Sequence, residues 1–379
     1  MTYDFDSPVD RRGTNSLKWD LYKGKDIIPL WVADMDFRVS PAITRALRAH
    51  VDHGVFGYTL VPGELIDAVI GRLAAQYQWK IERDWIVWLP GLVTGINVAC
   101  RAVGDTGDEV LTMTPVYPPF LTAPGNVSRE LRTVPLVERA GGWEIDFDLL
   151  ERAITPRTRM LLLCSPQNPT GRVFTRGELS TLAQICERHD LVICSDEIHC
   201  ELVLDTDTEH IPTATLGPDV ERRTITLMAP SKTFNIPGLG CAFAVISDKP
   251  LRRQFLRAMR GIVPHVNALG YTATLAAYRD SRDWHLALLD YLRENRDIVE
   301  RSIEAMPGLS MRHAEATYLA WIDTRQTGME GPVTTFEEAG VGLSDGRPFG
   351  AEGFVRLNFG CPRSVLEEAL QRMLKVMKT

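Results

Sequence analysis

The sequence predicts an α/β protein built on a mostly parallel sheet, and two observations lead to this prediction. Five short, almost continuously apolar runs alternate with segments in which leucines and alanines recur at helical spacing. Strands that are covered on both faces have such runs, and alternation of strands with helices is typical of parallel sheets. The runs are residues 109–113, 160–164, 191–195, 224–228 and 242–246.

The rest of the chain suggests a second, smaller unit. After about Leu286 the pattern changes to a long charged helix, the strand-like runs YLAWID and FVRLNF, a glycine-rich stretch and a final helix. A chain of 379 residues is also too long for one simple core. We therefore expect a large domain at residues 50–285 and a smaller α+β domain made of residues 1–49 and 286–379.

Composition excludes several classes of protein. The formal net charge of −7 argues against a surface for nucleic acid or anionic membrane, which needs clustered Lys and Arg. No apolar run approaches the roughly 18 residues that span a bilayer, and the N-terminus has no apolar signal-peptide region. Seven cysteines without a C-x-x-C pair favour a reducing cytoplasm over a disulfide framework. The scattered histidines predict no metal site.

Three polar residues directly follow three of the apolar runs. They are Asn168 in SPQNPTG, Asp196 in SDEIH and Lys232 in APSKTFN. Taken alone, each has an ordinary structural explanation: a turn, a helix cap and a solvated lysine. Because ligands of open α/β sheets bind at the carboxyl ends of the strands, the three together predict one crevice.

These motifs, in this order, resemble the signature of fold-type I enzymes that use pyridoxal 5′-phosphate (PLP), in the class I/II aminotransferase superfamily. More closely, the chain resembles the MalY/PatB-type C–S lyases, which are cystathionine β-lyase-like, over essentially its whole length. The resemblance implies the aspartate aminotransferase fold, with a seven-stranded sheet in the large domain. Further stretches that carry it are GTNSLKWD (13–20), WVADMDF (31–37), HGVFGYT (53–59), GDEVLTMTPVYPPF (107–120) and FVRLNFGCP (354–362).

The resemblance implies a role for each of the three polar residues. Lys232 would hold PLP as a Schiff base and act as general base, which requires a lowered pKa. Asp196 would pair with the pyridine nitrogen and keep it protonated. Asn168 would donate to the 3′-oxygen of the cofactor.

Other residues are expected to hold the phosphate and the substrate. Backbone N–H groups at the helix start that contains Val93 and Thr94 would bind the phosphate, with the Thr94 and Ser231 hydroxyls, although a ligand-free turn is the alternative. Tyr58 would reach the phosphate of a neighbouring subunit, which implies a homodimer with shared sites. Arg356 would bind the substrate carboxylate, with a structural ion pair as its alternative.

Two aromatic side chains complete the expected site. Tyr117 would stack on the pyridine ring, and a core tyrosine is the alternative. His199 would lie near the 3′-oxygen, and a histidine packed against the sheet is almost equally compatible with the sequence.

Two positions differ from many aminotransferases. Gly240 stands where an Arg usually holds the phosphate, and His199 stands where a Tyr is usual. Both differences match the C–S lyase subgroup. The leading hypothesis is therefore a β-elimination that cleaves cystathionine, or a related cysteine S-conjugate, to a thiol, pyruvate and ammonia. A PLP-dependent aminotransferase is the first alternative, and a PLP-binding regulatory protein is the second.

Overall fold

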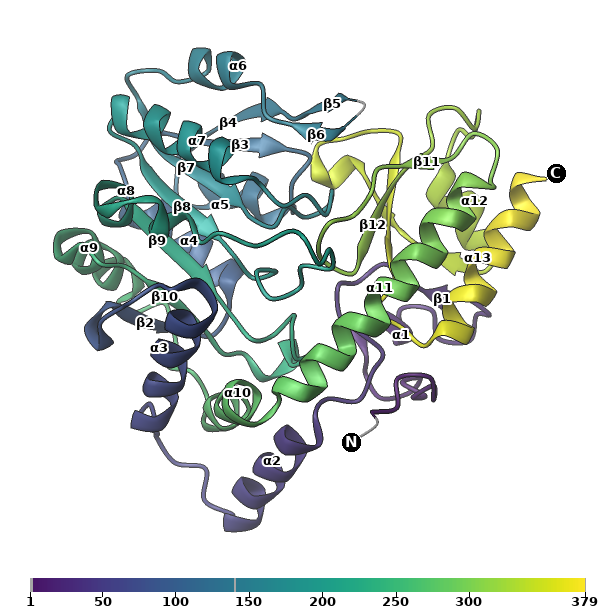
Figure 1. The fold of residues 1–379 in the computed structure, drawn as a ribbon, viewed down its shortest axis with the longest axis horizontal. Helices are drawn as coiled ribbons and strands as arrows, with labels where there is room; N and C mark the ends of the chain where they lie inside the picture. The colour runs from purple at the N-terminus through teal and green to yellow at the C-terminus, as the bar shows by residue number, and fades with distance from the viewer. Residues whose placement is uncertain (1–2, 140, 379) are drawn as a thin grey trace.

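The largest feature of the structure is a seven-stranded sheet (Figure 1). The computed structural model describes residues 3–139 and 141–378. In spatial order the strands are β2 (Ile86–Leu89), β10 (Ala242–Val245), β9 (Thr224–Met228), β8 (Val192–Asp196), β7 (Thr158–Cys164), β3 (Glu109–Thr114) and β4 (Glu130–Pro135). All neighbours from β9 to β4 are parallel, whereas β10 is antiparallel to both β2 and β9. The predicted mostly parallel seven-stranded sheet is confirmed.

All five apolar runs form strands of this sheet, as β3, β7, β8, β9 and β10, with bounds within two residues of those predicted. Their side chains alternate between the two faces of the sheet, and both faces pack into hydrophobic cores. In β7, for example, Met160 and Leu162 pack on one face, while Leu161 and Leu163 pack on the other. Burial on both faces explains why the runs are continuously apolar.

Helices cover both faces of the sheet. Residues of α4, α5 and α9 share one core with the strands. On the opposite face, residues of α6 and α7 share a second core and those of α3 a third. One of the segments with leucines and alanines at helical spacing is α7, whose start is fixed by a capping box between Thr175 and Glu178. The helices are α1 (Leu17–Asp20), α2 (Pro41–His53), α3 (Gly63–Tyr77), α4 (Leu92–Ala102), α5 (Pro119–Asn126), α6 (Phe147–Arg152), α7 (Arg176–Arg188), α8 (Pro218–Arg222), α9 (Lys249–Met259), α10 (Ala268–Asp280), α11 (Arg282–Glu304), α12 (Pro332–Glu338) and α13 (Arg363–Met377).

A smaller sheet lies beside the large one (Figure 1). It contains, in order, β11 (Ser310–Met311), β12 (Leu319–Asp323), β15 (Phe354–Asn358) and β14 (Ser344–Asp345). Its core includes residues of α11 and α13 and also Phe5, Ile28 and Leu30 from the N-terminal segment. Two further pairs are β1 (Ile28–Pro29) with β13 (Val341–Gly342) and β5 (Val137–Arg139) with β6 (Gly142–Glu144).

Two helices connect the elements around the two sheets. The predicted domain boundaries, at 49/50 and 285/286, fall inside α2 and α11 respectively. Helix α11 runs from the side of α10 to the small sheet (Figure 1), and its buried residues Trp284 and Val299 belong to one core cluster. The division into two domains therefore stays a prediction.

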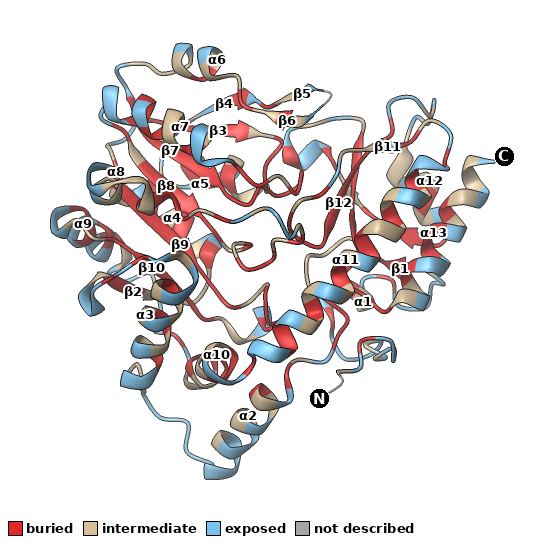
Figure 2. Ribbon diagram, in the orientation of Figure 1, coloured by how far each residue is buried: buried red, intermediate tan, exposed pale blue. Residues whose placement is uncertain are grey.

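The most exposed apolar segment is the loop between α2 and α3, which is coloured as exposed in Figure 2. It carries Val55, Phe56, Tyr58 and Leu60, of which Tyr58 is fully exposed. No helix in the described part of the chain is both long and apolar enough to cross a membrane.

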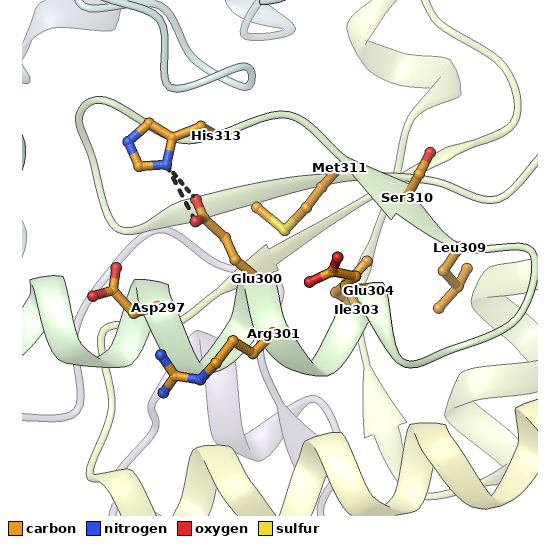
Figure 3. A pocket seen from close by; sticks show the side chains of 9 residues that line it. All are labelled: Asp297, Glu300, Arg301, Ile303, Glu304, Leu309, Ser310, Met311 and His313. Atoms are coloured by element: carbon orange, nitrogen blue, oxygen red, sulfur yellow. Dashed lines mark hydrogen bonds and ion pairs between the residues drawn. The ribbon is translucent and has the colours of Figure 1, made fainter.

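Strand β11 forms one edge of the small sheet. His313, two residues after β11, links this edge to Glu300 on α11 (Figure 3). Its Nδ1 lies 2.9 Å from Glu300 Oε1, and its Nε2 lies 3.0 Å from Asp205 Oδ1. The hydrogen bond to Glu300, opposed by partial burial and assisted by Asp205, raises the pKa of His313 from 6.5 to about 9. The charged imidazole therefore stabilises the folded chain.

A raised pKa sets the pH window of this contribution. The contribution is complete below the unfolded pKa of 6.5 and is lost as the pH rises through about 9. Because the side chain is about half exposed, we expect His313→Gln to lower the melting temperature by only about 1–2 °C at pH 6, and by less at pH 10. Calorimetry at both pH values measures this, with the exposed His53→Gln as control. Equal losses at the two pH values would contradict it.

Candidate active site

The three polar residues predicted to converge lie at the ends of adjacent strands. Asp196 is the last residue of β8, while Asn168 and Lys232 follow β7 and β9. The charges of Asp196 and Lys232 are close enough to shift each other's pKa. Asn168 contacts a fourth predicted residue, Arg356, with its Oδ1 accepting a hydrogen bond of 3.0 Å from Nη1. The structure thus brings residues from both sheets to one place.

Lys232 has a perturbed amine. Its Nζ donates a hydrogen bond of 2.6 Å to the carbonyl oxygen of Ala33. Burial and the nearby Arg356 lower the pKa of Lys232 to about 8, against the opposing charges of Asp34 and Asp196. A substantial neutral fraction therefore exists near neutral pH, and a neutral amine is a nucleophile and a base.

Asp196 is a buried carboxyl group. Burial raises its pKa to about 7, although a hydrogen bond of 3.1 Å from the Ile198 N–H and the charge of Lys232 both favour the ionised form. A buried carboxylate gains most from a cationic partner. This side chain suits a protonated ring nitrogen.

Arg356, in the middle of β15, is a buried guanidinium held by neutral groups. Its Nη2 donates to the Trp31 carbonyl at 2.9 Å, and its Cζ lies 4.7 Å from the centroid of the Phe349 ring. Its Nε is buried, and no residue in the described part of the chain forms a hydrogen bond with it. Burial lowers the pKa of Arg356 to about 10, so it remains a cation that can bind a carboxylate.

Tyr117 and His199 lie against these charged groups. Burial raises the pKa of Tyr117. The nearby charge of Arg356 lowers this pKa and that of Asp196 raises it. His199 is buried, and its Nδ1 has no hydrogen-bond partner among the described residues. Burial, with Lys232 and Arg356, lowers its pKa to about 3, so the ring is neutral.

The expected phosphate site is the start of α4. Its N-cap is Gly91, so no side chain caps the first N–H groups, which include those of Val93 and Thr94. Gly240 lies beside this helix start, because a Cβ built on it would be 3.1 Å from the Pro90 carbonyl oxygen. Free N–H groups at a helix N-terminus suit an anion. Ser231, next to Lys232, is partly buried.

Tyr58 is the predicted residue that the chain does not bring to this cluster. Its side chain is fully exposed in the α2–α3 loop. With Pro264–Tyr271 this loop lines a hollow of about 870 Å³, whose lining contains none of the other predicted site residues.

One part of the site is the strap, which we define as residues 31–37. Its sequence WVADMDF carries part of the resemblance, but the role of its backbone was not predicted. The Ala33 carbonyl accepts from Lys232 and from Tyr318, and the Trp31 carbonyl accepts from Arg356. Backbone carbonyl groups occur in every residue, so the sequence does not show which of them act as acceptors. Tyr318 lies in an apolar run that is typical of a hydrophobic core. The available signal was the polar Asp34 and Asp36 inside an otherwise apolar segment.

The hollow drawn in Figure 3, about 520 Å³ in volume, lies along α11 and β11 and contains none of the predicted site residues. Among the described residues, no group of three or more His, Cys, Asp or Glu side chains is placed to hold a metal ion.

The donors and acceptors of the site fit PLP. An amine with a lowered pKa suits the aldehyde, the Asp196 carboxyl suits the ring nitrogen, and the uncapped α4 start suits the phosphate. The Asn168 amide suits the 3′-oxygen, because its Oδ1 is taken by Arg356 and its NH₂ group can donate. The Nδ1 of His199 is buried and has no hydrogen-bond partner among the described residues, so it also suits the 3′-oxygen of the cofactor.

The fold and this site define a class of protein. The family model for aminotransferases of class I and II matches residues 25–373. The chain belongs to that family.

Its relatives include carbon–sulfur lyases, as the resemblance implied. Cystathionine beta-lyase PatB of Bacillus subtilis (strain 168) is 37% identical, with 98% of each chain covered. Among solved structures, OvoB has a TM-score of 0.97 at 46% identity, with both chains fully covered. Cystalysin from Treponema denticola, which contains PLP, has a TM-score of 0.95 at 34% identity over 100% of this chain and 99% of that one.

The strap depends on a buried lysine. Lys18 is fully buried; its Nζ lies 2.8 Å from Asp36 Oδ2 and 3.2 Å from the Asp34 carbonyl oxygen. Lys18→Met leaves Asp36 with Arg11 and Trp19 only. We expect a loss of about 2–3 kcal/mol in the free energy of unfolding, measured by urea titration. The exposed Lys23→Met is the control, and equal stability of both variants would refute the prediction.

Proposed function

We propose that this chain is a PLP-dependent carbon–sulfur β-lyase that cleaves cystathionine or a related cysteine S-conjugate to a thiol, pyruvate and ammonia. The observation that carries the proposal is the Lys232 amine, whose pKa is lowered to about 8 in a cluster with Asp196 and Arg356. The relative PatB, named a cystathionine beta-lyase, supports the choice of reaction.

In this proposal a residue of the site binds each functional group of the cofactor. Lys232 would hold it covalently, Asp196 would pair with its ring nitrogen, and Tyr117 would lie on its ring. The N–H groups of Val93 and Thr94, with the Thr94 and Ser231 hydroxyls, would bind its phosphate. Asn168 and His199 would lie at the 3′-oxygen, and the Asn168 amide would donate a hydrogen bond to it. When bound, PLP supplies an aldehyde that joins to amines and a protonated ring that accepts the electrons released at the substrate Cα.

The protein supplies orientation and proton transfer. Arg356 would take the substrate carboxylate on its Nε, which has no hydrogen-bond partner among the described residues, and so direct the Cα–H bond at Lys232. The neutral Lys232 amine would remove that proton. The sulfur then leaves from Cβ as a thiol, and water converts the remaining three-carbon fragment to pyruvate and ammonia.

The first alternative, an aminotransferase, shares these early steps. Two residues favour the lyase: Gly240 beside the α4 start, where an Arg is usual in aminotransferases, and the neutral His199, where a Tyr is usual. Without that Arg, the phosphate would depend on backbone amides, Ser231 and Tyr58.

Incubation of the purified protein with L-cystathionine and PLP tests the proposal. We expect pyruvate and homocysteine in equal amounts, and no product with the Lys232→Ala variant, which should also lack the visible absorbance of a lysine-bound cofactor. Amino transfer to a 2-oxo acid without pyruvate would establish the aminotransferase instead. A panel of cysteine thioethers then ranks the sulfur substrates by pyruvate release.

The proposal includes a cytoplasmic homodimer in which each site receives Tyr58 from the other subunit. The exposed apolar loop at 55–60 supports the dimer, because monomers rarely expose Val55, Phe56 and Leu60 together without a partner. All seven cysteines, which lie in the described residues, are free, and this fits a reducing compartment.

A shared site predicts complementation. Lys232→Ala and Tyr58→Ala homodimers should each be nearly inactive, but a heterodimer of the two has one site with both residues intact. Mixing the variants under conditions that exchange subunits should therefore restore up to about one quarter of wild-type activity. Recovery is measured as pyruvate release. No recovery, despite subunit exchange seen by mass spectrometry, would place Tyr58 and Lys232 in the same subunit's site.

A further inference from the structure

The strap has no regular secondary structure, yet side chains bind almost all of its carbonyl groups. Irregular backbone near a protein interior must find such partners, because an unpaired buried carbonyl is costly. The donors are Arg356 and Ser344 to Trp31, Asn358 to Val32 and Asp34, Lys232 and Tyr318 to Ala33, Lys18 to Asp34, Asn235 to Met35 and Phe37, and Arg11 to Met35.

The Ala33 carbonyl differs from the others because it accepts from the reactive lysine. Lys232 Nζ lies 2.6 Å from its oxygen, and Tyr318 Oη lies 2.9 Å from the same atom. A carbonyl oxygen has two lone pairs, so the two donors share its capacity. The single amide of Asn358 fixes the carbonyls on either side, at 2.5 and 2.6 Å. The orientation of the Ala33 carbonyl therefore does not depend on Tyr318.

Tyr318 is suited to act as a neutral donor. It immediately precedes β12, and its side chain is buried. Burial raises its pKa above the usual value, so the phenol keeps its proton. Its ring lies edge-on to His199, with 6.2 Å between the ring centroids, which places it within the site described above.

We propose that Tyr318 is a positioning residue that acts on Lys232 through the Ala33 carbonyl. The carbonyl gives the free amine a fixed resting position, and the Tyr318 hydroxyl takes part of the acceptor's capacity, so the ammonium form is held less strongly. The amine then leaves this position more readily for the cofactor. The inference rests on the proposed function, because it requires Lys232 to be the lysine that bonds PLP.

The direction of the effect follows from the groups that face Lys232. They are Arg356 on β15, Asp34 on the strap, Asp196 at the end of β8, and the neutral His199, Tyr117 and Tyr318. Tyr318→Phe changes none of these charges and removes only the competing donor. The hydrogen bond from the ammonium to Ala33 becomes stronger, and the pKa of the free Lys232 amine rises.

The pH dependence of cofactor uptake measures this pKa. PLP is added to the apoenzyme, and the rate at which visible absorbance appears is recorded across the pH range around 8. Only the neutral amine reacts, so the rate has an inflection at its pKa. In Tyr318→Phe we expect the inflection to rise by about half a pH unit, which makes uptake about threefold slower below it. An unchanged or lowered inflection overturns the inference.

Three further variants make the test specific. Tyr77→Phe removes a buried hydroxyl beside Cys200, away from the strap, and should leave the inflection unchanged; a rise equal to that in Tyr318→Phe overturns the inference. A fluorinated tyrosine at position 318 is a stronger hydrogen-bond donor and should lower the pH of the inflection. If Tyr318→Phe does not fold, this variant tests the inference in its place, and an unchanged or raised inflection overturns it. If Lys232→Ala still gains the absorbance, the lysine assigned under the proposed function is wrong; if only the Tyr318 shift is missing, that assignment stands.

Discussion

The site depends on a cationic side chain, Lys232, that is partly buried beside another cation, Arg356. Burial and Arg356 both destabilise the ammonium form of Lys232, and Asp34, Asp196 and the Ala33 carbonyl restore part of that loss. The balance leaves a pKa of about 8, low enough for a neutral amine and high enough for the amine to accept a proton again. A lysine in water would remain protonated, and one without these acceptors would be a weak base.

The strap connects the groups that set the pKa of Lys232 to distant parts of the fold. Its carbonyls receive donors from the N-terminal segment, from the end of the large sheet and from β15 of the small sheet. A shift of the strap would therefore move the acceptors of Lys232 and Arg356 together. Irregular backbone in which nearly every carbonyl has a partner is also stiff, so the distance between amine and guanidinium is set by hydrogen bonds rather than by loop packing.

The sequence predicted the sheet well because its central strands are buried on both faces, which leaves continuous apolar runs such as 160–164. It did not reveal that β10 is antiparallel, because an apolar run carries no direction. The convergence of Asn168, Asp196 and Lys232 followed from their places after consecutive strands. The role of the strap could not be found in this way, because its acceptors are backbone atoms. Its donors Tyr318 and Asn358 lie in apolar runs, 285 and 326 residues away from the carbonyls they bind.

In the proposed function Arg356 binds the substrate carboxylate, and the pairing of charges in the structure leaves it available for that role. The strap carries two carboxylates, Asp34 and Asp36, that could neutralise it. Instead Arg11 bridges both at 2.7 and 2.6 Å, and Lys18 holds Asp36 from the opposite oxygen. Among the described residues, the hydrogen-bond partners of Arg356 are neutral, so an incoming carboxylate would be its first anionic partner. The ion pairs of Arg11 and Lys18 thus stabilise the N-terminal segment. In the proposed function they also keep the acids of the strap occupied, so that Arg356 stays free for the substrate carboxylate.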